Sequence, residues 1–257
     1  MTTKFEEFRK LHSGETPLLI GNVWNVQTAL QYEKLGFKAI GTSSAAIAND
    51  LGYEDGEDMP FEDYFFMIKR IAFSTKLPLT VDLEAGYGST AEAIITNIIR
   101  LHEVGVVGIN IEDSEVKKSE RKIEDTEHFT IKLKAIVGGL KKRNIPMFIN
   151  VRCDAFLLDL SNALNESIHR IKQYKTANID GIFLPCITNA NDIKMIAETI
   201  DVPLNVMCMP NLPNFEALKT LGVKRISMGN FMHAFFNKQL EVVTKEIIEK
   251  NSFSPIF

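Results

Sequence analysis

The chain has 257 residues, of which 45% are hydrophobic and 24% are charged, and these proportions are ordinary for a globular protein with a sizeable core. Its 29 Lys and Arg against 33 Asp and Glu give a formal net charge of -4, so nucleic acid and membrane surfaces are not expected partners. No apolar stretch reaches the roughly 18 residues that a membrane span needs, and the polar N-terminus does not read as a signal peptide. Three cysteines without paired spacing favour reduced thiols, so we expect a cytoplasmic protein.

Short apolar runs alternate with helical patterns along the whole chain. The expected strands cover residues 17–24, 39–43, 77–81, 107–113, 146–152, 181–185, 204–207 and 224–229. The expected helices cover residues 26–35, 61–74, 90–104, 129–142, 161–176, 192–199, 215–221 and 231–249, with a long polar loop before the second helix. Eight such units predict one α/β domain over residues 1–257, a (β/α)8 barrel of the TIM type. A doubly wound open sheet is the alternative, but no linker interrupts the eight units.

Two carboxylates stand at the end of the third expected strand. Asp82 and Glu84 are two residues apart, so on a strand both side chains point to the same face. A buried strand end is a poor place for two anions unless a cation neutralises them. Gly86 and Gly88 follow and allow the backbone to turn sharply close to a ligand. This stretch predicts a site for a divalent cation.

Active sites of such barrels lie at the C-terminal ends of the strands, and further polar residues are expected there. They are Ser43, Ser44, Glu112, Asp113, Arg152, Asp154 and Asn205. Mg²⁺ prefers oxygen ligands and keeps several waters, and an arginine can hold a substrate carboxylate with two hydrogen bonds. The alternative is that Asp82, Glu112 and Arg152 form a buried ion network that only closes the barrel.

Three motifs carry a family resemblance: Asp-Leu-Glu-Ala-Gly-Tyr-Gly at 82–88, Gly-Ile-Asn-Ile-Glu-Asp at 108–113 and Asn-Val-Arg-Cys-Asp-Ala-Phe at 150–156. Together they resemble the isocitrate lyase/phosphoenolpyruvate mutase superfamily, in particular its phosphoenolpyruvate phosphonomutase-like branch. The resemblance extends over most of the chain and implies the same barrel fold. It also implies a Mg²⁺ cofactor, with Mn²⁺ as the alternative metal.

The resemblance further implies a role for each matching residue. Asp82 would bind the metal directly, and the carboxylates that hold its waters would be Asp55, Glu84 and Glu112. The substrate would contact Ser43, Ser44, Ala45, Asp82, Arg152 and Asn205, with Trp24 either packing over it or capping the barrel. The groups assigned to catalysis are Lys118, Arg152 and Asp55.

One loop departs from the family pattern. The lyases for isocitrate and methylisocitrate carry Lys-x-Cys-Gly-His after the fourth strand, whereas residues 114–121 here contain neither cysteine nor histidine. Those two lyase activities are therefore not expected. The loop keeps a lysine at Lys118 but has Glu120 where the phosphonate enzymes have asparagine, and Pro185 replaces the mutase histidine.

The resemblance thus implies a Mg²⁺-dependent lyase or mutase that acts on a small 2-oxo acid or phosphonate similar to phosphoenolpyruvate, phosphonopyruvate or oxaloacetate. The reaction would cleave or rearrange a C–C or C–P bond through a metal-stabilised enolate. The alternative is a non-catalytic binder of 2-oxo acids that keeps the metal site. Relatives also imply a homo-oligomer, a dimer or tetramer in which the last helix packs on a neighbouring subunit. The apolar residues of segment 231–236 and of tail 253–257 are compatible with that.

Overall fold

The computed structural model describes residues 3–117 and 120–257. Its nine labelled parallel strands form a closed barrel with eight staves, because the first two strands belong to one segment. The strands are β1 (Leu18–Leu19), β2 (Gly21–Val23), β3 (Ile40–Thr42), β4 (Leu79–Asp82), β5 (Val106–Glu112), β8 (Phe148–Arg152), β9 (Gly181–Leu184), β10 (Leu204–Met207) and β11 (Arg225–Ser227). Their order is β1-β11-β10-β9-β8-β5-β4-β3-β2. Strands β1 and β2 are successive parts of one segment, so the pairing of β1 with β11 and of β2 with β3 closes the sheet. The predicted barrel is confirmed.

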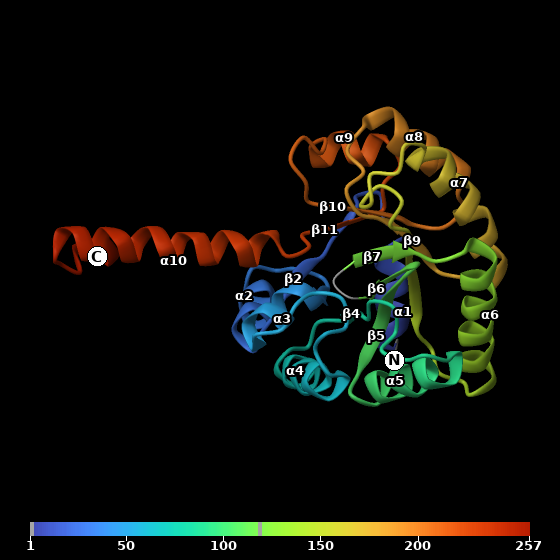
Figure 1. Ribbon diagram of the computed structural model, residues 1–257, viewed down its shortest axis with the longest axis horizontal. Coiled ribbons are helices and arrows are strands. Elements are labelled where there is room, and N and C mark those ends of the chain that lie inside the picture. The colour runs from blue at the N-terminus through green and yellow to red at the C-terminus, as the bar shows by residue number, and fades with distance from the viewer. Residues whose placement is uncertain (1–2, 118–119) are drawn as a thin grey trace.

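Helices surround the barrel, as Figure 1 shows, and cover the outward faces of its strands. The helices are α1 (Lys4–Leu11), α2 (Val26–Lys34), α3 (Ser44–Leu51), α4 (Phe61–Ser74), α5 (Ala91–Glu103), α6 (Thr126–Lys142), α7 (Ala163–Tyr174), α8 (Ala190–Thr199), α9 (Phe215–Thr220) and α10 (Phe231–Lys250), with 3₁₀ turns η1 (Lys175–Ala177) and η2 (Ser254–Ile256). Strands buried on both faces are rich in apolar residues, and all seven residues of β5 are buried, Asn110 and Glu112 among them. Within the described ranges, none of these helices has the length and apolar character needed to cross a bilayer.

Three elements differ from the sequence-based expectation. Helix α3 occupies the start of the expected polar loop, because Ser43 caps it through the backbone N–H of Ala46. The loop after β5 contains an antiparallel hairpin of β6 (Ser114–Lys117) and β7 (Glu120–Ile123), which pairs with no barrel strand. Helix α1 begins with a capping box in which Thr3 and Glu6 exchange hydrogen bonds. Charged residues hid the apolar pattern of α1 and of the hairpin, whereas α3 is a short helix with a single charged residue, Asp50.

Helix α1 closes the end of the barrel at which the strands begin. Phe8 is fully buried and meets Phe148 edge to face at 5.4 Å between ring centroids. Gly108 on β5 leaves room for that ring, because an added Cβ would lie 3.0 Å from it. His12 stacks on Phe148 at 4.3 Å and shares a 2.9 Å hydrogen bond between its Nδ1 and the Phe8 carbonyl. This aromatic group therefore packs α1 against the barrel.

Replacing His12 by leucine should reduce the acid sensitivity of the fold. Burial, followed by repulsion from Arg225, lowers the pKa of His12 to about 3. The unfolded chain binds a proton on this imidazole below about pH 6.5 while the folded chain does not, so its contribution to stability is lost as the pH falls. The loss amounts to about 1.4 kcal/mol per pH unit below that point. Urea unfolding at pH 7 and pH 5 should show a smaller drop for His12→Leu than for the wild type; equal drops would contradict the assignment.

Candidate active site

A cavity of about 420 Å³ opens at the C-terminal ends of the barrel strands. Its charged and polar lining comes from six strands or the loops that follow them. These residues include Asn22, Thr42, Ser43, Ser44, Asp55, Thr80, Asp82, Asn110, Arg121, Arg152, Arg225, Ser227 and Asn230. One wall is apolar and consists of Leu157, Leu158, Phe183, Pro185 and Met207. We call this space the barrel-mouth cavity.

Asp82 ends β4 and lies partly buried on the wall of this cavity. Its carboxylate accepts hydrogen bonds from Ser44 Oγ at 3.0 Å and from Asn110 Nδ2 at 3.2 Å. Burial raises the pKa of Asp82, while Arg152 and these two donors act in the opposite direction. The carboxylate is thus held in one orientation but is not fully neutralised.

Glu84 follows on a strained turn. Its φ is +52°. Gly86 follows with a φ of +114°, and a Cβ there would lie 2.7 Å from Ile94, so both the backbone conformation and the space require glycine. The Tyr87 hydroxyl donates to Glu84 Oε1 at 3.0 Å, whereas buried Oε2 has no hydrogen-bond partner among the described residues. Burial, then repulsion from Asp55 and Glu112, raises the pKa of Glu84 well above its usual value. An unpartnered buried carboxylate oxygen is costly, which points to a ligand or water beside it.

Glu112 and Asp154 form a buried ion network with Arg152. Arg152 Nη1 lies 2.8 Å from Glu112 Oε2, and Arg152 Nε and Nη2 lie 2.6 and 3.1 Å from the two Asp154 oxygens. Burial raises the pKa of Glu112 to about 8 despite Arg152. This pairing matches the structural alternative considered for the sequence, but Arg152 also lines the barrel-mouth cavity. The network can therefore both hold the strand ends and face a substrate.

The β6–β7 hairpin adds a second guanidinium. Arg121 contacts Glu112 and lies 3.4 Å from Asp154 through Nη1, while its Nη2 lies 3.1 Å from Asp55 Oδ2. Asp55 belongs to the loop after α3, and Gly56 beside it packs on Val116 of the hairpin. Two loops are thereby joined over the mouth of the barrel. Arg121 was not among the residues that the sequence predicted for the site.

The N-terminus of α3 faces the same cavity. Ser43, Ser44 and Ala45 all line it, and the first N–H groups of a helix are suited to bind an anion. The partial positive charge of the helix end lies beside Asp82, as the Ser44 hydrogen bond shows. A substrate carboxylate bound here would accept hydrogen bonds from these N–H groups and would lie close to Asp82.

Amides and one arginine make the floor beneath Asp82 polar. Asn150 Nδ2 donates to Asn110 at 2.9 Å and to Asn205 at 3.2 Å, and Arg225 Nη2 donates to Asn110 at 3.3 Å. Arg225 is only 2% exposed, and burial lowers its pKa to about 10. Sequence reasoning missed Arg225 because it starts a strand instead of ending one. The available signal was a charged residue inside a short stretch predicted to be a buried strand.

The family model described as phosphoenolpyruvate phosphomutase matches residues 8–248. The chain belongs to this family. An uncharacterised protein of Mycobacterium tuberculosis is 31% identical over 223 residues, which cover 87% of this chain and 81% of that protein. The 2-methylisocitrate lyase of Shewanella oneidensis is 29% identical over 204 residues, 77% of this chain and 68% of the lyase.

Solved structures agree with this assignment to the phosphoenolpyruvate phosphomutase family. A provisionally named phosphonomutase of Burkholderia cenocepacia has a TM-score of 0.88 and 31% identity, and covers 94% of this chain and 99% of its own. A phosphonopyruvate hydrolase solved with oxalate and Mg²⁺ shares the fold, with a TM-score of 0.85, 20% identity and coverage of 98% and 89%. The predicted superfamily is confirmed, and its members are lyases and mutases that act on oxo acids and phosphonates.

Three residues predicted for the site do not line the barrel-mouth cavity in the part of the chain that the structure describes. Trp24 is buried and meets the His233 ring at 5.2 Å, and it is not among the residues that line the barrel-mouth cavity. Asn205 is buried in the floor network, where it donates to Ser227 Oγ at 3.1 Å. Lys118 lies outside the described residues. The catalytic and binding roles of these residues stay predictions.

The predicted metal ligands lie in two adjoining cavities. Asp55 and Asp82 line the barrel-mouth cavity, whereas Glu84 and Glu112 line a neighbouring cavity of about 420 Å³ that also contains Glu57 and Glu115. Across residues 3–117 and 120–257, no three His, Cys, Asp or Glu side chains converge as a preformed metal centre. The donor set fits Mg²⁺, which commonly takes one or two carboxylates and retains its waters. Unpartnered Glu84 Oε2 and the raised pKa values of the acids fit a missing positive charge here.

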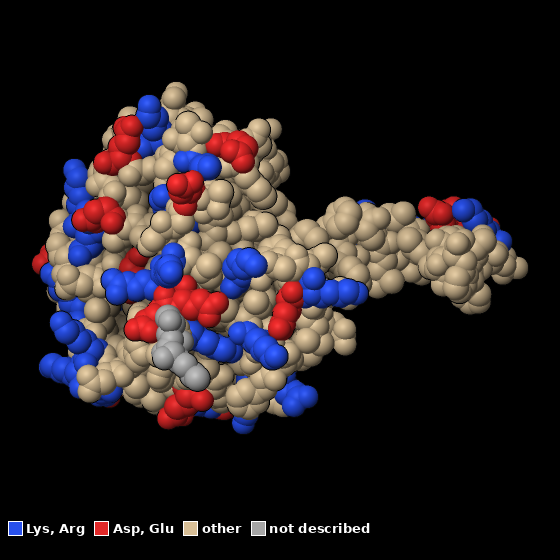
Figure 2. Space-filling view, turned by 180° about the vertical axis from the view of Figure 1, so that it is seen from behind, with Lys and Arg blue, Asp and Glu red and all other residues tan. Residues whose placement is uncertain are grey.

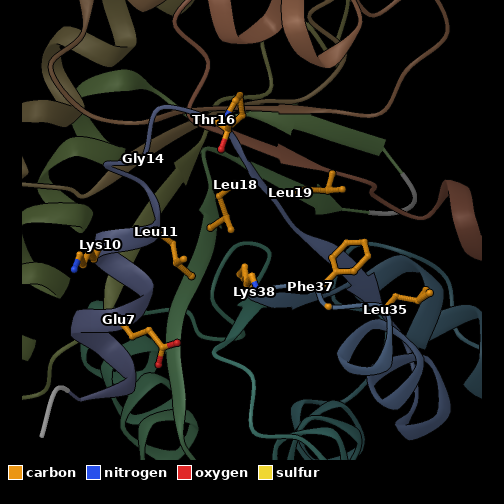
Figure 3. A pocket seen from close by; sticks show the side chains of 12 residues that line it. Glu7, Lys10, Leu11, Gly14, Thr16, Leu18, Leu19, Leu35, Phe37 and Lys38 are labelled. Carbon is orange, nitrogen blue, oxygen red and sulfur yellow. The ribbon is translucent and has the colours of Figure 1, made fainter.

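Another cavity, at the opposite end of the barrel, offers no comparable chemistry. It measures about 550 Å³ and lies between α1, α2 and the start of β1. Figure 3 shows the side chains around it, which combine leucines and a phenylalanine with a few charged groups. Its lining includes Leu11, Leu18, Leu19, Leu35 and Phe37, with Glu7, Lys10 and Lys38 as its charged members. The barrel-mouth cavity is the candidate active site because it lies at the C-terminal ends of the strands and contains Asp82 and Arg152.

Proposed function

We propose that this protein is a Mg²⁺-dependent lyase or mutase that acts on a small 2-oxo acid or phosphonate. The observation that carries the proposal is the position of Asp82, oriented by Ser44 and Asn110 on the wall of a cavity that also contains the α3 N-terminus and Arg152. Mn²⁺ is the alternative metal. The reaction would cleave or rearrange a C–C or C–P bond through a metal-stabilised enolate.

We assign each of these side chains a role in the reaction that agrees with its contacts. Asp82 would hold the metal directly, and Asp55, Glu84 and Glu112 would orient its waters. When bound, Mg²⁺ would draw electron density from the substrate's oxo group and stabilise negative charge on that oxygen. Ser43, Ser44 and Ala45 would bind the carboxylate through backbone N–H groups and a hydroxyl. Arg152, already oriented by Asp154, would offset the negative charge that develops on the substrate.

The leaving group is the least defined part of the substrate. Relatives named 2-methylisocitrate lyase are about as similar to this chain as other relatives, but the described part of hairpin segment 114–123 contains no cysteine or histidine to act as their acid. We therefore propose a smaller substrate, such as an oxaloacetate-like acid, phosphonopyruvate or phosphoenolpyruvate. Lys118, which lies outside the described residues, stays a candidate catalytic residue.

A substrate screen tests the proposal. Oxaloacetate, phosphonopyruvate, phosphoenolpyruvate and methylisocitrate are each incubated with the protein and Mg²⁺. Pyruvate formation reports bond cleavage, and phosphorus NMR reports interconversion of phosphoenolpyruvate and phosphonopyruvate, which releases no pyruvate. A Mg²⁺-free sample and a protein-free sample with Mg²⁺ are the controls. We expect turnover of one of the first three and none of methylisocitrate. Binding without turnover, seen as a ligand-dependent rise in melting temperature, would support a non-catalytic 2-oxo acid binder instead. Neither binding nor turnover would reject both functions.

We also propose that the single-domain chain forms a cytoplasmic homo-oligomer through α10. This helix projects from the barrel, as Figure 1 shows, and carries few charged side chains on the face seen in Figure 2. Its exposed apolar residues are Phe231, Met232, Phe235, Phe236, Leu240, Val242 and Ile248, followed in the tail by Phe253, Ile256 and Phe257. Exposed apolar surface of this extent favours burial against another copy. The cysteines, Cys153, Cys186 and Cys208, are free, as expected for the cytoplasm.

Changing Phe235 and Phe236 together to glutamate should disrupt the oligomer. Two charges on the apolar face of α10 would have to be buried unpaired in the subunit contact. Light scattering after gel filtration should then give the mass of one chain, 28.9 kDa, in place of a multiple of it. Gln239→Glu, which adds a charge at an exposed polar position of the same helix, is the control. A wild-type protein that already has the mass of one chain would reject the oligomer.

A further inference from the structure

Arg121 extends the cationic lining of the barrel-mouth cavity to its rim. Its Nη1 donates to Ser114 Oγ at 2.9 Å as well as to Glu112, and its side chain is 15% exposed. The residue lines the barrel-mouth cavity on one side and an outer cavity, formed by loop 54–58 and Val116, on the other. Arg121 is thus part of the wall between the candidate substrate space and solvent.

The three arginines that line the barrel-mouth cavity differ in depth and in attachment. Arg225 lies on the floor, where its Nη2 donates to Asn110. Arg152 ends a barrel strand and is fixed by the two Asp154 oxygens. Arg121 is carried by β7, and the hairpin to which β7 belongs pairs with no barrel strand. Among the three, Arg121 is therefore the one whose position can adjust to a ligand without deforming the barrel.

The carboxylates that hold Arg121 overlap with those proposed to orient the waters of the metal. Asp55 and Glu112 belong to both sets. A divalent cation bound near Asp82 would attract the same two carboxylates and weaken their hold on the guanidinium, since the charges lie in a partly buried space. Arg121 would then have hydrogen-bond donors available for an anion in the cavity.

We propose that Arg121 is a specificity-determining residue that pairs with an anionic group at the outer end of the substrate. This inference rests on the proposed function. The inner carboxylate of the substrate lies against the α3 N-terminus and Arg152, and the outer carboxylate or phosphono group lies beneath the hairpin. A guanidinium pairs with either group through two parallel hydrogen bonds, which an ammonium group cannot reproduce.

Calorimetric titrations in Mg²⁺ test this inference with ligands that differ at the outer end. Oxalate has no group beyond its two adjacent carboxylates, 3,3-difluorooxaloacetate carries an outer carboxylate, and phosphonopyruvate carries an outer phosphono group. Arg121→Met should weaken binding of at least one of the latter two by about 30-fold, the loss expected for a charged hydrogen-bonded pair. Arg121→Lys should recover part of that loss. Oxalate, titrated in saturating Mg²⁺, should bind Arg121→Met within about 3-fold of the wild type, since it lacks the outer anionic group. Mg²⁺ itself should bind the variant at least as tightly as the wild type, because Arg121 and the metal compete for Asp55 and Glu112.

Lys122→Met serves as the matched control, because Lys122 lies on the same strand but is 68% exposed and pairs with Glu120. An equal loss of oxalate and outer-anion binding in Arg121→Met would show that Arg121 only maintains the site, and would overturn the inference while the proposed function stands. Undiminished binding of both outer anions would also overturn it. A wild-type protein that binds none of the three ligands in Mg²⁺ would instead reject the proposed function, and the inference with it.

Discussion

Replacing Asp82 by alanine should lower the affinity for Mg²⁺ by more than about 100-fold, because loss of an outer-shell partner alone typically costs 10–100-fold. Asp82 is the carboxylate that Ser44 and Asn110 hold toward the barrel-mouth cavity. Titration calorimetry with Mg²⁺, or with Mn²⁺ followed by its paramagnetic signal, measures the change directly. Retention of full metal affinity by Asp82→Ala would remove our assignment of the metal site.

The same variant should remain folded. Burial raises the pKa of Asp82, so its ionised form is destabilising in the absence of a cation, and its removal relieves repulsion with Asp55 and Glu84. Against this, Ser44 and Asn110 each lose an acceptor, at a cost of about 1–3 kcal/mol for a buried donor. The melting temperature without Mg²⁺ should therefore change by only a few degrees. Asp201→Ala, at an exposed acid paired with Lys175, controls for nonspecific loss of charge and should leave Mg²⁺ affinity unchanged.

The barrel could be predicted because its strands are short apolar runs at regular spacing. Parallel strands buried on both faces are mostly apolar, so the charged residues at their C-terminal ends identify the active-site rim. Asp82, Glu112 and Arg152 are such exceptions, and each ends its strand as expected. Their mutual contacts follow from the closed sheet, which brings neighbouring strand ends together.

Contacts made by loops could not be read in the same way. Arg121 reaches Asp55 across 66 positions of sequence, and nothing in either loop indicates that a guanidinium will lie between two carboxylates from different elements. The hairpin that places it has alternating charges instead of apolar residues, because it is packed on one side only by the mouth of the barrel. Arg225 was missed for a related reason: its partner Asn110 is 115 residues away and lies on the opposite part of the closed sheet.

Replacing Arg152 by methionine should damage both the fold and the site. Arg152 is the buried partner of Asp154 and Glu112, and removal of one member of such a pair leaves an uncompensated charge that typically costs about 3–5 kcal/mol. Arg121 also contacts both acids and would still compensate part of their charge. We therefore expect the free energy of unfolding to fall by about 3 kcal/mol, the lower end of that range. Urea unfolding at pH 7 measures it. Arg143→Met, at a half-exposed arginine paired with Glu92, should change stability by less than about 1 kcal/mol.

The two roles of Arg152 can be separated with Arg152→Lys. A lysine keeps the positive charge beside Glu112 but cannot form the bidentate contact with Asp154. If the residue offsets charge on the substrate, Arg152→Lys should recover much of the stability yet still bind oxalate with Mg²⁺ at least about 10-fold more weakly than the wild type. If Arg152 only holds the strand ends together, oxalate affinity will return in proportion to stability. That result would favour the purely structural ion network over an anion-binding arginine, and the substrate carboxylate would then have to be held by α3 alone.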